Sequence, residues 1–372
     1  MIQAYLVPIE EAAFVFFGLA VLLLIPICAV HYRRFGYVMP SRATVFYSLL
    51  FYSLCAVFLV SLPLPTITAD FCEVHTLARQ VRLTPFQFVP DIILGNQITL
   101  RHFNLISMLV SSVFLQAFFN FLLLMPLGFY LRYYFNLGWG GAAAIALAVT
   151  GLFELSQITG LFGFYPCPYR TFDVDDLILN TAGALVGYGT MPFFSAHLPN
   201  LQARHAPPVA VSCGRRWVAF AVDWFLANSV SRLLGALLLG LHTPHALWLD
   251  GLVYGLWFVG VPSLWQGRTV GKALVNIQLV QSSGQPVQLS QLALRYGLLL
   301  GLPVLTEVAL LHQLSEQQRG WITISLLILL VLEAIALAGL MLVRPDHRGL
   351  HDLMADTHHH VLASRQQNTV SL

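Results

Sequence analysis

Polar and charged residues gather between residues 154 and 180, closely enough spaced to form one site. Glu154 and Gln157 are three residues apart and share one helix face. Asp176 and Asn180 are four residues apart and do the same. Arg170 supplies a cation that can pair with a nearby aspartate, Asp173 or Asp176. Such a set can bind a polar solute, or one carboxylate can act as a general base. We define the outer polar cluster as Asn120, Glu154, Gln157, Arg170, Asp173, Asp176 and Asn180.

Further charges lie inside apolar segments of the second half. Arg216 and Asp223 are seven residues apart, two turns along one helix face. Asp223 and Glu333 have no cation at their own depth, so each is either protonated and hydrogen-bonded or binds a cation. Arg232 and Glu307 lie at similar depth and predict a structural ion pair. No set of metal ligands and no phosphate-binding glycine loop stands out, so we expect no metal site and no cofactor.

The elements that position these residues are predicted to be membrane helices. Of the 372 residues, 57% are hydrophobic and only 10% are charged, against about 25% charged in soluble domains. The mean hydropathy is +0.73. The net charge of +2, without runs of like charge, argues against a nucleic-acid-binding protein.

Nine apolar segments are long enough to cross the hydrocarbon core, which takes about 20 helical residues. They are continuous and do not alternate, which favours helices over a membrane barrel. We therefore expect an all-α integral membrane protein with about nine transmembrane helices, at 12–30, 43–62, 106–131, 138–155, 177–195, 217–241, 246–265, 292–311 and 321–343. Most Arg and Lys fall in one of the two alternating sets of loops, which predicts an outside N-terminus and a cytoplasmic C-terminus.

A polar linker with three prolines separates five helices from four. It predicts a membrane domain at 1–196, a cytoplasmic linker at 197–212 and a second membrane domain at 213–372. Gly183 and Gly187 give the fifth predicted span a small face that another helix can approach closely. Cys72 and Cys167 both fall in outside loops, where they either form a disulfide or stay as two thiols.

The first half resembles the VanZ family of bacterial membrane proteins, named for a member linked to low-level teicoplanin resistance. The resemblance rests on Asn120…Pro126-Leu127-Gly128, on Glu154-x-x-Gln157, and on Arg170-x-x-Asp173-x-x-Asp176-x-x-x-Asn180-x-x-Gly183. Arg82 stands where an Asn is frequent in that family. The resemblance implies a membrane fold in the bacterial inner membrane.

The second half resembles the RDD family. Three motifs come in the family's order: Arg216-x-x-Ala219-x-x-x-Asp223, Gly267-x-Thr269-x-Gly271-Lys272 and His351-Asp352-x-x-Ala355. Transport, including sodium/proton exchange, has been proposed for some members. We define the inner cluster as Arg216, Asp223, Lys272, Glu333, His351 and Asp352. The loop at 267–280 alternates weakly, which predicts a short amphipathic or hairpin element.

Three functions fit these patterns. The first, which we prefer, is transport or binding of a polar or lipid-linked envelope solute, with a cation or proton and membrane lipid as partners. The VanZ resemblance extends it to glycopeptide (teicoplanin-type) resistance. The second is an envelope enzyme with Glu154 or Asp176 as general base, which we disfavour because no nucleophile motif accompanies it. The third is a scaffold whose outer aspartates cap a helix and whose buried charges fix helix register.

Overall fold

The computed structural model describes residues 2–95, 105–201, 211–239, 247–312, 340–341 and 343–362. Internal contacts divide the chain into two compact units. The first unit comprises Met1–Val21 and Pro40–Ala203, and the second comprises Leu22–Met39 and Arg204–Leu372. Helix α1 (Ile2–Phe35) therefore contributes residues to both units. The boundaries expected at the linker stay predictions, and the assignment of 22–39 adds a feature that linker composition could not show.

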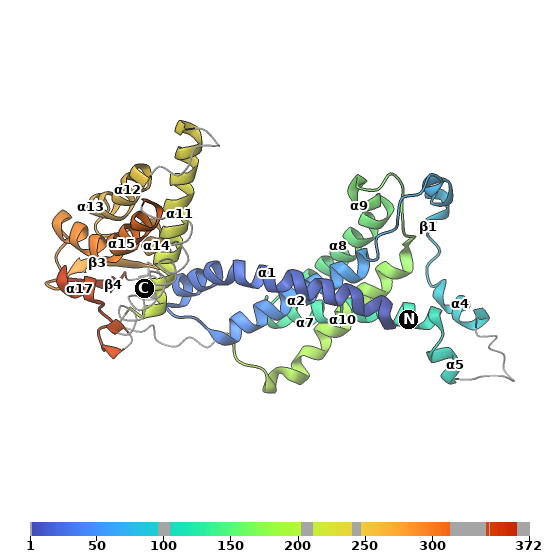
Figure 1. Cartoon of the computed structure of the whole chain (residues 1–372). Helices are drawn as coiled ribbons and strands as arrows, with labels where there is room; N and C mark the ends of the chain where they lie inside the picture. The colour runs from blue at the N-terminus through green and yellow to red at the C-terminus, as the bar shows by residue number, and fades with distance from the viewer. Residues whose placement is uncertain are drawn as a thin grey trace. The chain divides into compact units, whose positions relative to one another are not determined.

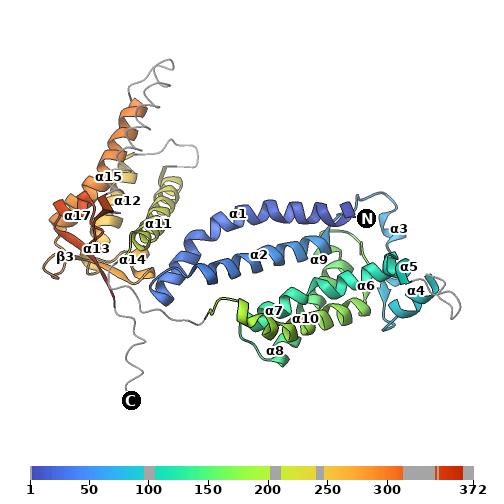
Figure 2. The ribbon, with the colours of Figure 1, turned by 90° about the horizontal axis from the view of Figure 1, so that it is seen from below.

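The first unit is a bundle in which α10 lies along α6, α7 and α8 (Figures 1 and 2). Its long helices are α2 (Pro40–Ser61), α6 (Ser112–Leu123), α7 (Met125–Tyr133), α8 (Trp139–Ile158) and α10 (Val174–Phe194). The break between α6 and α7 falls at Leu124, two residues before Pro126 in the first turn of α7. Proline lacks a backbone N–H and is tolerated in a first turn, so it accounts for the interruption.

Glycines allow α10 to approach its neighbours closely. A Cβ added at Gly183 would overlap the backbone carbonyl of Phe121, and one at Gly187 would overlap that of Met125. Gly128 of α7 is held in the same way against the carbonyl of Ala184. The small face predicted from Gly183 and Gly187 is therefore the face on which α10 packs.

Five helices among the described residues are long and apolar enough to cross a membrane, as a helical membrane protein requires. They are Leu6–Phe35, Pro40–Ser61, Ser112–Tyr133, Trp139–Ile158 and Val174–His197, and they overlap the first five predicted spans. The predicted span at 321–343 lies almost entirely outside the described residues. The count of nine therefore stays a prediction.

Short elements connect α2 to α6 and α8 to α10 in the first unit. They are α3 (Phe71–Val74), a 3₁₀ turn (Leu77–Arg79), β1 (Val81–Arg82), α4 (Phe88–Gly95), α5 (Leu105–Leu109), α9 (Gly160–Gly163) and β2 (Phe172–Asp173). Strands β1 and β2 pair in parallel, which places Arg82 opposite Asp173. Cys72 and Cys167 are joined as a disulfide, with their Cα atoms 5.5 Å apart.

We expect reduction to change the gel mobility of the oxidised wild-type protein, because the Cys72–Cys167 bond closes a loop across a sequence separation of 95. The Cys72→Ser variant should migrate alike with and without reductant. Cys213→Ser removes a free cysteine of the second unit and should behave as the wild type. Alkylation of both Cys72 and Cys167 in the oxidised protein would contradict this expectation.

The second unit places helices around a two-stranded sheet (Figure 1). Its elements are α11 (Cys213–Leu239), α12 (Leu247–Gly255), a π-helical segment (Leu256–Gly260), α13 (Val261–Leu264), α14 (Val270–Leu274), β3 (Ile277–Gln281), α15 (Leu289–His312), α17 (Leu350–Met354) and β4 (Thr357–Val361). Strands β3 and β4 are antiparallel, with Leu279 opposite His359. Ile277 and Leu279 are fully buried.

The all-α expectation is therefore corrected, because both units contain a short sheet. The loop at 267–280 does contain a strand, but its main partner is β4 near the C-terminal end of the described chain rather than an adjacent hairpin strand. Local alternation predicts a strand and carries no information about a distant partner.

Candidate functional site

The first carboxylates of the outer polar cluster meet where α8 ends and α10 begins. Glu154 is 2% exposed, and its Oε2 accepts a hydrogen bond from the backbone N–H of Asp173 at 3.0 Å. Asp173 is the N-cap of α10, and its side chain accepts from the N–H of Asp175 at 2.9 Å. Burial raises the pKa of Asp173, and the neighbouring carboxylate of Asp175 adds to that rise. Arg82 approaches Asp173 to 4.0 Å.

The cluster continues along the contact between α8 and α10. Asp176 accepts a hydrogen bond from the side-chain amide of Asn120 on α6. One turn further on, the amide of Asn180 donates to Thr150 on α8 at 3.2 Å. The Oδ1 atom of Asn180 is buried and has no hydrogen-bond partner among the described residues. The structure thus brings Asn120, Glu154, Asp173, Asp176 and Asn180 to one region of three helices.

Two members of the predicted cluster instead hold the end of α2. Gln157 donates to the carbonyl of Val60 at 3.5 Å, and Arg170 donates to the carbonyl of Leu62. The expected pairing of Arg170 with Asp173 or Asp176 is therefore wrong. Arg82 takes that place beside Asp173, because the parallel pairing of β1 with β2 puts the two residues in register.

Asp175 lies beside the outer polar cluster, but the sequence prediction did not include it. It is 3% exposed, and its carboxylate accepts from the backbone N–H groups of Phe86 and Phe88. Phe86 has a φ of 62°, a strained left-handed conformation for a bulky residue. Asp175 therefore fixes the turn that leads into α4. In the sequence, Asp175 stands out because it lies between Asp173 and Asp176. Its contacts with distant backbone N–H groups cannot be predicted from that position.

The carboxylate of Asp223, in the second unit, accepts its hydrogen bonds from neutral donors. It accepts from the indole Nε1 of Trp257 at 3.2 Å, from the backbone N–H of Gly271 at 2.8 Å and from the hydroxyl of Thr269. Thr269 is the N-cap of α14, so Asp223 sits at the positive end of that helix. A side chain at Gly271 would collide with Asp223 and with the carbonyl of Ala219. The glycine of this motif therefore permits the contact.

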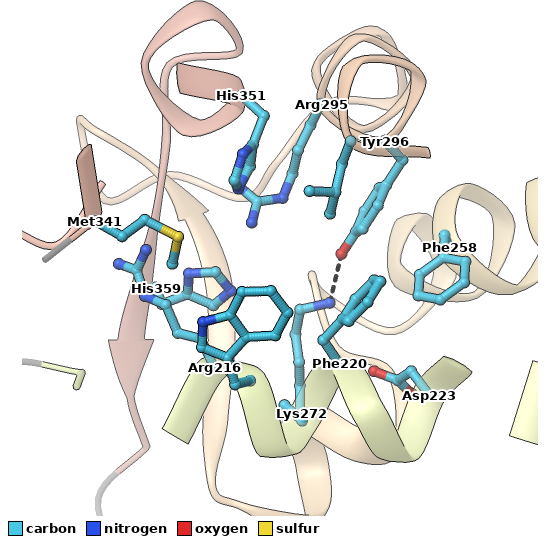
Figure 3. Close-up of a pocket in the computed structure, with 13 residues that line it drawn as sticks. Arg216, Phe220, Asp223, Phe258, Lys272, Arg295, Tyr296, Met341, His351 and His359 are labelled. Carbon is cyan, nitrogen blue, oxygen red and sulfur yellow. Dashed lines mark hydrogen bonds between the residues drawn. The ribbon is translucent and has the colours of Figure 1, made fainter. Parts of the chain in front are cut away.

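Lys272 follows within α14 and is 4% exposed. Its Nζ lies 2.7 Å from the hydroxyl of Tyr296 on α15 and 3.4 Å from that of Thr269. Figure 3 shows Lys272 and Tyr296 extending toward each other across a cavity. The ammonium group is thus held among hydroxyl groups, with an aromatic ring beside it.

Asp352 joins two arginines from different helices. Its Oδ2 lies 3.0 Å from Nη1 of Arg216 on α11, and its Oδ1 pairs with Nη1 of Arg295 on α15. Arg295 also donates to Thr357 of β4, and Arg216 to the carbonyl of His347. Asp352 is fully buried and belongs to α17. One carboxylate therefore ties the N-terminal turn of α11 to α15 and to the C-terminal segment.

These groups surround a cavity of about 80 Å³ in the second unit (Figure 3). Arg216, Asp223, Lys272, Arg295, His351 and His359 contribute to its walls. Four members of the predicted inner cluster therefore line this cavity, namely Arg216, Asp223, Lys272 and His351, and Asp352 lies beside it against Arg216. Arg295, which the predicted inner cluster lacked, joins it through a pairing with Asp352 that depends on tertiary packing.

Two parts of the chain match protein-family models. Residues 49–195 match the VanZ/LLP1 family model, and residues 210–356 match the RDD family model. The chain joins a VanZ-like region to an RDD region. Comparisons with curated proteins and with solved structures gave no significant match. The order of the two resemblances expected from the motifs is confirmed.

Some predicted residues of the RDD region lie outside the described residues or side chains. Glu333 belongs to an undescribed segment, and the side chain of Glu307 is undescribed. The ion pair between Arg232 and Glu307 therefore stays a prediction. Asp250 of α12 accepts a hydrogen bond from Ser231 of α11.

Acid is expected to destabilise the RDD region through two histidines, His351 and His359, whose pKa values the fold lowers. Burial, with Arg295 and Arg216 close by, lowers the pKa of His351 to about 3, and the neighbouring Asp352 at 3.5 Å does not offset this. Burial also lowers the pKa of His359 well below its usual value, and Arg216, Arg295, Lys272 and His351 add to that effect. Unfolded histidine takes a proton near pH 6.5, whereas these side chains stay neutral when folded. The stability from the neutral forms is complete above about pH 6.5 and is lost as the pH falls toward 3, at up to about 1.4 kcal/mol per pH unit for each group.

Thermal unfolding measured between about pH 7.5 and about pH 5 checks this expectation. Lowering the pH over this range should destabilise the wild type more than His351→Gln, which lacks the titrating imidazole. His197→Gln removes an exposed histidine of the VanZ-like unit and should keep the wild-type slope. The same pH dependence in the wild type and in His351→Gln would contradict this expectation.

Proposed function

We propose that the protein transports or binds a polar or lipid-linked solute of the bacterial cell envelope. The observation that supports this proposal is the set of carboxylates in the VanZ-like region. Glu154, Asp173 and Asp176 gather at one end of α8 and α10. Among the described residues, Arg82 is the cation within 4.0 Å of them, and its side chain is 60% exposed. Carboxylates are costly at a membrane unless they are paired or used, so we assign these to solute recognition.

The amides of the outer polar cluster complete the proposed solute site. Asn120 bonds Asp176, and Asn180 presents a buried carbonyl oxygen without a partner among the described residues. Carboxylates and an amide oxygen together accept hydrogen bonds from hydroxyl and amino groups. A sugar or amine-bearing envelope molecule offers those donors.

The proposal includes a membrane arrangement. We place the chain in the bacterial inner membrane with about nine spans, the N-terminus outside and the C-terminus in the cytoplasm. The distribution of Arg and Lys supports this orientation. Membrane lipid is then a partner, and a proton or cation is a second one.

Glycopeptide susceptibility of a bacterial host tests the proposal. Expression of the wild-type chain should lower sensitivity to teicoplanin, and Glu154→Gln or Asp176→Asn should restore it while the protein still accumulates in the membrane. Glu73→Gln makes the same charge change at an exposed position on α3 and should act as the wild type. If both cluster variants protect the host fully, the proposed site is wrong. Loss of both from the membrane would favour the scaffold function.

A further inference from the structure

The cavity of the RDD region has an excess of positive charge. Its walls include Arg216, Lys272 and Arg295, whereas Asp223 is the carboxylate that lines it among the described residues. Asp352 lies beside it and contacts both arginines. His351 and His359 add no charge because burial keeps them neutral. Three cations therefore face two carboxylates.

Both carboxylates are already occupied. Asp223 accepts from Trp257, Thr269 and Gly271. Asp352 accepts from the two arginines and from the backbone N–H of Gly349 at 3.1 Å. Neither acid is therefore available to balance the third cation, Lys272, through a direct ion pair.

Some hydrogen-bond donors of the residues that line this cavity remain unused. The Nε atoms of Arg216 and Arg295 are buried and have no acceptor among the described residues, and the two residues are 6% and 3% exposed. An ammonium group has three donors, and the described contacts of Lys272 are with Tyr296 and Thr269. Buried donors without acceptors are costly, so an acceptor group in the cavity would be stabilised.

We propose that this cavity binds a phosphate group, carried either by inorganic phosphate or by an anionic lipid headgroup. Planar guanidinium groups and a lysine are the side chains that recognise phosphate oxygens best. A water needs about 10–15 Å³ of such space, so a cavity of about 80 Å³ has room for a tetrahedral group. The remaining wall is apolar, with Phe220, Leu299 and Met341 in it, which suits a phosphate attached to an apolar chain.

This site is separate in sequence from the outer polar cluster, so the proposal goes beyond the envelope solute and does not depend on it. Its failure would leave the teicoplanin experiment unaffected. That experiment changes residues of the VanZ-like region, whereas the next changes residues of the RDD region.

Binding to the purified full-length protein in uncharged detergent tests the proposal. Inorganic phosphate is titrated calorimetrically, and thermal unfolding is compared in micelles doped with phosphatidylglycerol or with phosphatidylcholine. In Lys272→Gln, we expect the affinity for inorganic phosphate to fall about tenfold or more. If phosphatidylglycerol alone stabilises the wild type, we expect its effect on the unfolding temperature to be lost in the same variant. Arg268→Gln makes the same charge change outside the cavity lining, where Arg268 contacts Gln278, and should bind as the wild type.

A second variant keeps the test decisive if Lys272→Gln does not fold. Leu299→Phe fills part of the cavity without changing its charge and should also weaken binding. A response to inorganic phosphate identifies the free ion as a source, and a response confined to phosphatidylglycerol identifies the lipid headgroup; either supports the proposal. Absence of both responses in the wild type overturns it. Equal weakening in Lys272→Gln and Arg268→Gln also overturns it, since surface charge would then explain the binding.

Discussion

Replacing Asp352 with asparagine is expected to destabilise the RDD region by about 3–5 kcal/mol. The side chain of Asp352 is fully buried, and it pairs with both Arg216 and Arg295. Asparagine keeps the shape and can still accept hydrogen bonds, but it removes the negative charge. Two guanidinium groups would then stay buried without a counter-ion, and an uncompensated buried charge costs more than a lost surface pair.

Thermal or denaturant unfolding of the purified protein measures this effect. Asp346→Asn is the matched control, because Asp346 pairs with Arg344 and Arg348 at the surface with 39% of its side chain exposed. Exposed pairs contribute about 0–1 kcal/mol. Our expectation fails if Asp352→Asn unfolds no more readily than Asp346→Asn. A double variant that also removes Arg216 should recover part of the loss, because one unpaired cation is gone.

Gly187→Ala is expected to disrupt the bundle of the VanZ-like region, with a loss of about 3 kcal/mol. The added methyl group would overlap the backbone carbonyl of Met125, and a backbone atom cannot move aside as a flexible side chain can. Helix α10 would have to separate from α7 along a contact that includes Gly128. Close packing without space for a methyl group makes such a change costly.

Gly189→Ala supplies the control on the same helix. A Cβ there meets only the indole ring of Trp139, at 3.6 Å, which is an ordinary contact. Gly189→Ala should therefore unfold near the wild-type temperature, and alanine should favour the helix slightly. Protease resistance of membrane-embedded protein gives a second readout. Equal stability of the two alanine variants would show that α10 does not pack on α7 through Gly187.

Local sequence patterns predicted much of the VanZ-like region. Apolar length located the first five spans, and the spacing of Gly183 and Gly187 located the packed face of α10. Each of these depends on neighbouring residues along one helix. The contact of Arg82 with Asp173 depends instead on two distant segments pairing as strands, and no local period contains that information.

In the RDD region, the contacts could not be predicted from the sequence for a different reason. Because the sequence offers no cation at its depth, Asp223 was expected to be either protonated and hydrogen-bonded or bound to a cation. Its actual partners are an indole, a hydroxyl and a backbone N–H, all of them neutral. A contact with a backbone N–H cannot be recognised from residue types. Lys272 and Asp352 were selected by resemblance, and only the fold shows that one faces Tyr296 while the other joins two arginines.

The assignment of residues 22–39 to the second unit matters for anyone who dissects this protein. Ala29 and Tyr32 of α1 pack against Val275 and Ile277, and the side chain of Asn276 donates to the carbonyl of Arg33. The RDD family match begins only at residue 210. A fragment cut at the proline-rich linker would therefore leave Val275 and Ile277 uncovered, and apolar surface of this kind promotes aggregation. Expression of the RDD region by itself requires this α1 segment to be supplied, either by fusion or as a second polypeptide.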